Sequence, residues 1–240
     1  TTSDPAGKEG AVNFITGMMD EGAADLDSAA FQARRDELAV RIMFDAGGDQ
    51  FEGAIQTLSK NRREAFALLR KALTAPHFEK EAMERVRQQF LLGAKDDEQD
   101  PEKIASRAWM KLALGDQLYA RHGAGSPQSI ANITPEDLRA LHRLIFSRRG
   151  LKVAVVGDID APTLGLALDE VFGGLPDTAP PAPVKDVVVA KGPLVKVIDR
   201  DIPQSIIVFG HDGILRNDPD FIPAFVMSNI LGGGGFASRL

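Results

Sequence analysis

The sequence predicts an α+β fold, and three observations support this prediction. Apolar residues recur at helical spacing through most of residues 8–147. The alternation of apolar and polar residues on both sides of Gly47-Gly48-Asp49 is typical of a β-hairpin. Short apolar runs bounded by glycine or proline, which are typical of strands, gather in the last third of the chain.

Two helices and a hairpin are expected in the first part of the chain. Between Lys8 and Glu21 the apolar residues lie at helical spacing, and Gly22 is suited to be a C-cap. Asp27 or Ser28 is suited to cap a second helix. The expected elements are a helix within 8–21, a helix over Ala29–Val40, and hairpin strands at Arg41–Ala46 and Gln50–Leu58.

Further helices and one buried strand are expected up to residue 172. Asp100-Pro101 places a proline at the first helical position, where its missing N–H costs nothing. Thr134 and Asp137 approximate a capping box at the start of another helix. The expected helices are Arg62–Thr74, Glu79–Lys95, Pro101–Leu114, a helix from Thr134 to Ser147, and Pro162–Phe172, and the strand is Leu151–Val156.

The composition then changes at a proline-rich linker. Gly173-Gly174-Leu175-Pro176 and Pro180-Pro181-Ala182-Pro183 favour an extended, semi-rigid connection. We therefore expect an N-terminal domain over 1–175, a linker over 176–186 and the start of a second α+β domain over 187–240. Within the second domain the expected elements are strands at Val187–Ala190, Leu194–Asp199 and Ser205–Gly210 and a helix at Asp220–Leu231.

The composition excludes several classes of function. Aspartate and glutamate number 34 against 28 lysines and arginines, which gives a net charge of -6. This balance argues against nucleic acid as a partner, because phosphate binding needs concentrated positive charge. The chain has no cysteine, which excludes thiol catalysis, iron–sulfur clusters and cysteine-bound zinc. No stretch approaches the roughly 20 apolar residues of a membrane span.

The histidines do not form a recognisable site. His77, His122, His142 and His211 each lack a second histidine three to five positions away, so no local pair of zinc ligands exists. His142 is expected to be a satisfied residue at a helix interface. The acidic run 95–100 lacks the spacing of a calcium loop and is typical of a solvated helix end. Neither a G-x-S-x-G elbow nor a phosphate-binding loop is present, so the motifs alone predict no active site.

Residues Gly10–Ala23, GAVNFITGMMDEGA, resemble the first helix of the insulinase/pitrilysin-type zinc metallopeptidases, which include mitochondrial processing peptidase. In active members this helix carries an inverted His-x-x-Glu-His motif, whose histidines hold zinc while the glutamate activates water. The matching positions here are Asn13, Thr16 and Gly17, and alignment on the Asp-Pro helix start puts Gly93 at the position of the third ligand. The resemblance implies a degenerate member with no catalytic residue, no metal ligand and no cofactor.

The resemblance covers essentially the whole chain and implies the family's fold, in which helices pack on a mostly antiparallel sheet. Leu151–Asp158 resembles a strand of the first domain, and Ile202–Ser205 and Leu231–Leu240 resemble the opening of the second, homologous domain. On this alignment the fold is incomplete at both ends. Its first strands, and any signal peptide, would precede Thr1. Most of the second domain would follow Leu240, including the arginine–tyrosine pair that degenerate subunits of bacterial heterodimers supply.

The resemblance also implies where a peptide binds. Arg41–Ile55 resembles the family's exposed edge strand and hairpin, onto which peptide substrates add as an extra strand. Phe44 is open to two roles, a side-chain pocket for the peptide or core packing. A glycine-rich loop like that at 232–235 is associated with substrate recognition in the non-catalytic subunit of mitochondrial processing peptidase; a flexible helix-to-turn connection is the alternative. The candidate peptide-binding residues are Ile42, Met43, Phe44, Asp45, Ala46, Gly232, Gly233, Gly234 and Gly235.

We therefore hypothesise a non-catalytic, peptidase-homologous subunit that pairs with a zinc-bearing catalytic subunit, or with itself, and helps to bind extended peptide substrates. One alternative is an active zinc metalloendopeptidase of the same family, which the residues oppose because asparagine, threonine and glycine cannot rebuild a three-ligand site. The other is a purely structural assembly subunit. Bacterial members of this degenerate subfamily are often exported, so the expected location is the periplasm and otherwise the cytoplasm.

Overall fold

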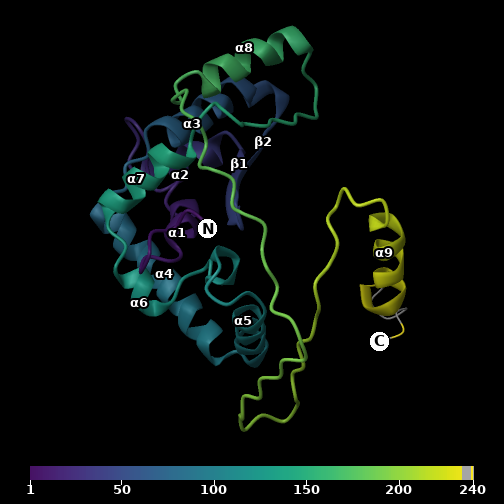
Figure 1. Cartoon of the computed structure of the whole chain (residues 1–240). Coiled ribbons are helices and arrows are strands. Elements are labelled where there is room, and N and C mark those ends of the chain that lie inside the picture. Colours follow the sequence, from purple (N-terminus) through teal and green to yellow (C-terminus); the bar gives the residue numbers. More distant parts are fainter. Residues whose placement is uncertain (234–238, 240) are drawn as a thin grey trace.

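The computed structural model describes residues 1–233 and 239, in which helices surround a small antiparallel sheet. The elements up to α8 form a curved body, and a long extended connection leads from it to α9 (Figure 1). This architecture confirms the predicted α+β class. The elements are α1 Ala11–Thr16, α2 Ser28–Glu37, β1 Arg41–Gly47, β2 Gln50–Gln56, η1 Ser59–Asn61, α3 Arg62–Thr74, α4 Lys80–Gln99, α5 Pro101–Leu114, η2 Leu118–Ala120, α6 Pro127–Ala131, α7 Pro135–Ile145, α8 Ala161–Phe172, α9 Phe221–Ser228 and η3 Asn229–Gly233.

Most predicted helix starts are confirmed because their capping residues form the expected bonds. The carboxylate of Asp27 accepts a hydrogen bond from the N–H of Ala30 at 2.8 Å, and that of Asp100 accepts from N–H groups in the first turn of α5. Thr134 and Asp137 cap α7 reciprocally. Both α3 and α5 have the predicted bounds, and α4 continues past its predicted end to the residue before Asp100.

α1 is shorter than the predicted helix within 8–21, and turns replace the rest. Its first N–H groups are capped from outside the helix. The buried carboxylate of Asp4 accepts from the N–H of Gly10 at 2.9 Å and from that of Val12 at 2.7 Å, while burial raises the pKa of Asp4. Gly10 has a φ of 94°, and a Cβ there would lie 2.7 Å from the carbonyl oxygen of Ala124. Both the backbone conformation and the available space therefore require glycine at this position.

The hairpin of β1 and β2 leaves one edge of β1 without backbone partners. Gly47 pairs with Gln50 across a two-residue turn, and the ladder continues to the start of β1. In such a hairpin the pair that closes the turn is hydrogen-bonded, and bonded pairs then alternate with non-bonded ones. The N–H and C=O groups of Ile42, Phe44 and Ala46 therefore point away from β2. No backbone group elsewhere in the described residues bonds to them.

The core is organised around α1, which packs against β1, α4 and α7. A row of rings connects the hairpin to α7. The ring centroids of Phe44 and Phe51 are 6.1 Å apart, and Phe51 meets the edge of Phe146 at 4.8 Å. His142 stacks on Phe146 at 4.5 Å and meets Phe78 edge-on at 5.8 Å. This row gives the small sheet its apolar support, since aromatic pairs in these geometries add to the free energy of burial.

The predicted strands outside the hairpin are wrong. A strand is held by hydrogen bonds to a neighbouring strand, and within the described residues no strand lies beside these runs. Their side chains are accordingly open to solvent: Val195 is 85% exposed and Ile207 is 80% exposed. The segments that are extended without a ladder are Leu151–Val156, Val187–Ala190, Leu194–Asp199 and Ser205–Gly210.

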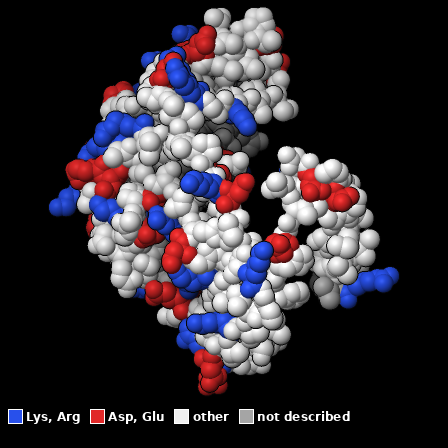
Figure 2. Space-filling model, in the orientation of Figure 1, with Lys and Arg blue, Asp and Glu red and all other residues white. Residues whose placement is uncertain are grey.

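The predicted C-terminal helix is confirmed by α9 and by the π-helical turn η3. Gly232 and Gly233 lie in that turn rather than in a loop, whereas Gly234 and Gly235 lie outside the described residues. Apolar side chains of α9 are exposed, and the surface over α9 carries few charges in Figure 2. Within residues 1–233 and 239, no helix has the length and apolar character needed to cross a membrane.

Candidate functional site

The positions that match the family's catalytic motif lie where α1 packs on α4. Asn13 is one turn before Gly17, and it lines a cavity. The hydroxyl of Thr16 donates to the carbonyl oxygen of Asn13 at 2.7 Å, so it is engaged within its own helix. Phe14 packs on Phe90 of α4 with ring centroids 5.1 Å apart. The face of α1 toward α4 is therefore apolar.

Phe90 fills the space that a side chain at position 17 would need. A Cβ on Gly17 would lie 3.0 Å from Cε2 of Phe90 and 3.1 Å from Cγ1 of Val86. Gly93, one turn further along α4, is exposed and has open space instead of a side chain. These residues do not fit a zinc ion, because they offer no imidazole or carboxylate and aromatic packing occupies one ligand position. Among the residues that the structure describes, no three His, Asp or Glu side chains gather as a metal-binding group.

Arg87 strengthens the same junction. Its guanidinium lies 5.7 Å from the centroid of the Phe14 ring and donates to the carbonyl oxygens of Ile130 and, at 2.8 Å, Ile133. The side chain is only 12% exposed. A planar guanidinium suits this double role, since it presents several fixed N–H groups and also lies well over an aromatic face. Arg87 thus ties α1, α4 and the end of α6 together.

The predicted peptide-binding residues of β1 lie together, with alternate side chains on opposite faces. Ile42 is buried, and Phe44 and Ala46 are half-buried against the core. The ring of Phe44 packs over Gly53, where a Cβ would lie 3.3 Å from it. Met43 points toward solvent. The structure does not bring Gly232 and Gly233 to this strand, because they follow α9, which stands apart from the body in Figure 1.

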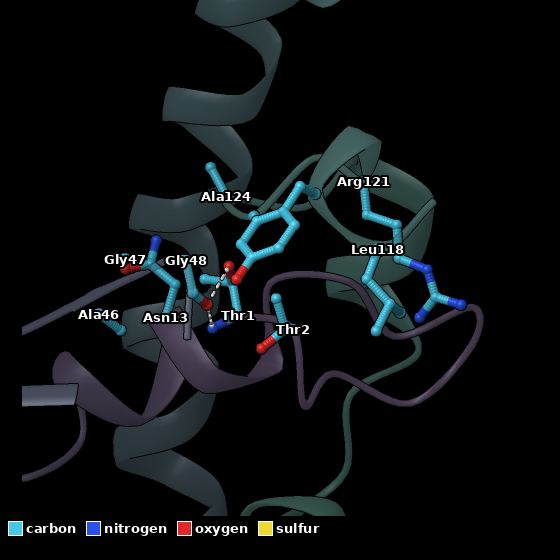
Figure 3. Close-up of a pocket in the computed structure, with 11 residues that line it drawn as sticks. Thr1, Thr2, Asn13, Ala46, Gly47, Gly48, Leu118, Arg121 and Ala124 are labelled. Carbon is cyan, nitrogen blue, oxygen red and sulfur yellow. Dashed lines mark hydrogen bonds between the residues drawn. The ribbon is translucent and has the colours of Figure 1, made fainter. Parts of the chain in front are cut away.

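A cavity of about 320 Å³ lies at the end of β1 (Figure 3). Ala46 and Gly47, the last two residues of β1, line it. Asn13 contributes from α1, and Leu118 and Arg121 contribute from the segment around η2 (Figure 3). The complete lining is Thr1, Thr2, Asn13, Ala46, Gly47, Gly48, Leu118, Tyr119, Arg121, Gly123 and Ala124.

Tyr119 joins the wall of this cavity to the hairpin turn. Its hydroxyl donates to Oδ2 of Asp49 at 3.0 Å. This bond is the main reason that the pKa of Tyr119 is raised, because the neighbouring carboxylate stabilises the protonated phenol. Position 119 holds the only tyrosine of the sequence, so its titration can be followed without interference.

The histidines lie away from this site except for His122, which follows Arg121. His142 is half-buried and satisfied, as predicted: its Nε2 donates to the carbonyl oxygen of Leu73 at 3.0 Å. Burial lowers the pKa of His142 by disfavouring the imidazolium. Its role is therefore to pack α7 against α3.

Sequence reasoning misses the residues that build the cavity wall. Tyr119 and Arg121 belong to no motif, and their segment has no helical or strand periodicity. The available signal in the sequence is Gly125, just after them, because a glycine can mark a place where two backbone segments come close together. A Cβ there would lie 2.3 Å from the carbonyl oxygen of Glu9. The segment before Gly125 must therefore pass directly beside the start of α1, whose Asn13 faces the cavity.

Comparison with known proteins identifies the family. A family model described as "Peptidase M16 inactive domain" matches residues 132–240. The chain is 26% identical over 238 residues to "Non-peptidase homolog YmxG" of Helicobacter pylori. The alignment covers 96% of this chain and 53% of that protein. These matches support a degenerate member of the insulinase/pitrilysin-type metallopeptidase family. The inactive-domain and non-peptidase matches support a non-catalytic peptidase-like protein.

Solved structures of the insulinase/pitrilysin-type family have the same fold. The peptidase M16 inactive domain from Pseudomonas fluorescens superposes with a TM-score of 0.84, at 23% identity, over 99% of this chain and 58% of that chain. Pitrilysin superposes with a TM-score of 0.68, at 15% identity, over 79% of this chain and 21% of that chain. The chain spans about half the length of the curated relatives it matches.

Proposed function

We propose that this protein is a non-catalytic subunit that binds extended peptides along the free edge of β1 and pairs with a zinc-bearing subunit of the same family. The observation that carries the proposal is the row of outward N–H and C=O groups at Ile42, Phe44 and Ala46. An extended peptide satisfies such groups by adding one more strand to the sheet. The degenerate motif at the junction of α1 and α4 means that peptide bound here would be cut by a partner.

The cavity at the end of β1 supports the same proposal. Its volume of about 320 Å³ lies at the lower end of the range for ligand pockets and has room for a side chain of a bound peptide. Asn13 and Tyr119 supply polar groups and Leu118 supplies apolar surface. A peptide paired with β1 therefore has a place for one side chain beyond Ala46, and the backbone pairing itself is independent of its sequence.

Substitution Ala46→Pro tests the edge. Proline removes the outward N–H of residue 46 but no bond of the β1–β2 ladder, and edge strands tolerate proline at such positions. The expected result is a loss of affinity of at least about tenfold for fluorescein-labelled ten-residue peptides of mixed sequence, measured by anisotropy, because a paired backbone bond is lost and the added strand is displaced. Ala46→Val is the matched control, since it keeps the N–H and should bind as the wild type does.

An unchanged affinity in Ala46→Pro, with the wild-type circular dichroism spectrum, would show that peptide does not pair with this edge. Pairing with a catalytic subunit is tested by co-expression with a family member that carries the His-x-x-Glu-His motif. Hydrolysis of unstructured peptides that needs both chains supports the proposal. Co-purification without any effect on hydrolysis favours the purely structural subunit. Location in the periplasm is part of the proposal, and cell fractionation tests it against the cytoplasm.

A further inference from the structure

Helix α5 has an apolar face that the other helices of the curved body leave open. None of its residues is completely buried, although it includes Trp109 and several alanines and leucines. The chain that follows the linker lies along this helix and contacts it near both ends and in the middle. The contacting residues lie between Val188 and Gly210, far from α5 in sequence.

At the C-terminal end of α5, the contact consists of hydrogen bonds to the backbone of the extended segment. The side-chain amide of Gln117 donates from Nε2 to the carbonyl oxygen of Val188 at 2.6 Å and accepts at Oε1 from the N–H of Val188 at 2.8 Å. The N–H of Ala190 donates to the carbonyl oxygen of Ala113 at 2.8 Å. Ala113 is in the last turn of α5, where carbonyl groups have no partner within the helix. The extended segment therefore caps the helix while Gln117 holds it in the manner of a neighbouring strand.

In the middle of α5, Gly210 lies against the indole of Trp109. A Cβ at position 210 would lie 2.6 Å from Cζ2 of Trp109, which any larger residue would have to displace. At the N-terminal end, a cavity of about 270 Å³ lies between Pro101 and the Ile202-Pro203 turn. The same segment thus lies beside α5 at successive points along the helix.

This docking is held by few buried side chains. Val188 is 74% exposed and Val197 is 83% exposed, so burial of apolar surface contributes little. Contacts that rest on exposed hydrogen bonds open more easily than a packed core does. Gln117 is also the residue directly before Leu118 and Tyr119, which line the cavity at the end of β1. A change at Gln117 therefore reaches η2 through the chain itself.

We propose that Gln117 and the last turn of α5 form a latch that reversibly holds residues 186–190, and that the closed latch also fixes η2 beside the hairpin turn. The latch sets how the chain after the linker is placed against the curved body formed by the elements up to α8. It does not depend on peptide binding by β1, so the two proposals fail separately.

Limited digestion with trypsin tests the latch. Lys191 lies one residue after the Ala190 bond, and its side chain is exposed. The backbone beside it must leave α5 before it can enter the active site of the protease. In Gln117→Ala we expect cleavage after Lys191, followed by mass spectrometry, to be on the order of tenfold faster, because two bonds to Val188 are lost and cleavage follows the population of the open form. Gln117→Glu keeps the acceptor and loses the donor, and an intermediate rate is expected. Gln128→Ala, at an exposed helical position without a bond to the segment, is the matched control.

Two spectroscopic probes complete the test, since the sequence has one tryptophan and one tyrosine. Release exposes Trp109, so its emission should shift to longer wavelength in Gln117→Ala. Gly210→Ala should cause the same shift with Gln117 intact, because the added methyl group cannot fit against the indole. If η2 is fixed by the latch, the ultraviolet titration of Tyr119 in Gln117→Ala should move to lower pH.

The latch is refuted if trypsin cleaves Gln117→Ala and Gly210→Ala within about twofold of the rate for Gln128→Ala. A faster cleavage with an unchanged Tyr119 titration would overturn the coupling to η2 and leave the docking of residues 186–190. Far-ultraviolet circular dichroism of each variant separates local release from unfolding. If Gln117→Ala does not fold, Gln117→Glu and Gly210→Ala carry the same comparison.

Discussion

Substitution Phe90→Ala should destabilise the protein at the place where active relatives bind their metal. Phe90 is half-buried, packs on Phe14 with ring centroids 5.1 Å apart, and lies over Gly17. In this chain the ring joins α1 to α4, so its removal opens a cavity between two helices of the core. Gly17 and Gly93, the glycines nearby, have no side chain that could close it.

The magnitude follows from burial and pairing. Replacing a completely buried phenylalanine by alanine costs about 3–5 kcal/mol. Phe90 is partly exposed, so roughly half of that, about 2 kcal/mol, applies to the lost burial. The pair with Phe14 adds about 0.5–1 kcal/mol. A decrease of about 2–3 kcal/mol in the free energy of unfolding is therefore expected, a large share of the ~5–15 kcal/mol that stabilises a typical domain.

Urea unfolding monitored by circular dichroism measures this change. Leu92→Ala on the same helix is the control, because Leu92 is 63% exposed and its loss should cost less than about 0.5 kcal/mol. Gly17→Ala gives a sharper test. Its methyl group is crowded by Phe90 and Val86 in the wild type and by Val86 alone in Phe90→Ala, so the two changes should couple by at least ~0.5 kcal/mol. Additive effects, or a Phe90→Ala cost no larger than that of Leu92→Ala, would refute the reasoning.

Three further predictions concern polar side chains that are buried or half-buried. The pKa of His142 is lowered in the folded protein. Its stabilising contribution is therefore complete above the unfolded pKa of about 6.5 and is lost as the pH falls toward the folded pKa. Urea unfolding from pH 7.5 to 5 should show a fall in the free energy of unfolding that is smaller in His142→Gln. Arg87→Lys should lower the free energy of unfolding by about 1–3 kcal/mol. One ammonium group cannot donate to the carbonyl oxygens of both Ile130 and Ile133 and also lie over the ring of Phe14. An unchanged urea midpoint would contradict this prediction. Asp4→Ala should cost about 1–2 kcal/mol through loss of the cap on α1, whereas Asp4→Asn, which keeps one acceptor, should cost less in the same assay.

The elements that the sequence predicts correctly are those with local causes. Asp27, Asp100 and Thr134 bond to N–H groups two or three positions ahead, so their helices begin where the residues indicate. The two-residue turn at Gly48 likewise fixes the hairpin register. The apolar run at Leu151–Val156 has strand character, but whether it forms a strand depends on a partner elsewhere in the chain, which its own residues do not encode.

The candidate site divides in the same way. Asn13, Thr16 and Gly17 can be located from the sequence because the motif they replace has a fixed spacing within one helix. Phe90 cannot, because a phenylalanine in the apolar stripe of α4 looks like any core residue until its neighbour is known. The cavity wall at Tyr119 comes from a segment without periodicity, and its position depends on the contact with the hairpin turn.

The free edge of β1 has a consequence for the protein in concentrated solution. Proteins usually guard such an edge by like charges or proline, which prevent two copies from joining edge to edge. An antiparallel pair of β1 strands centred on Met43 would set Arg41 of each copy opposite Asp45 of the other, and both side chains are exposed. These opposite charges favour the pair instead of opposing it. Self-association and peptide binding would then compete for one set of backbone groups, and dilution would favour the peptide.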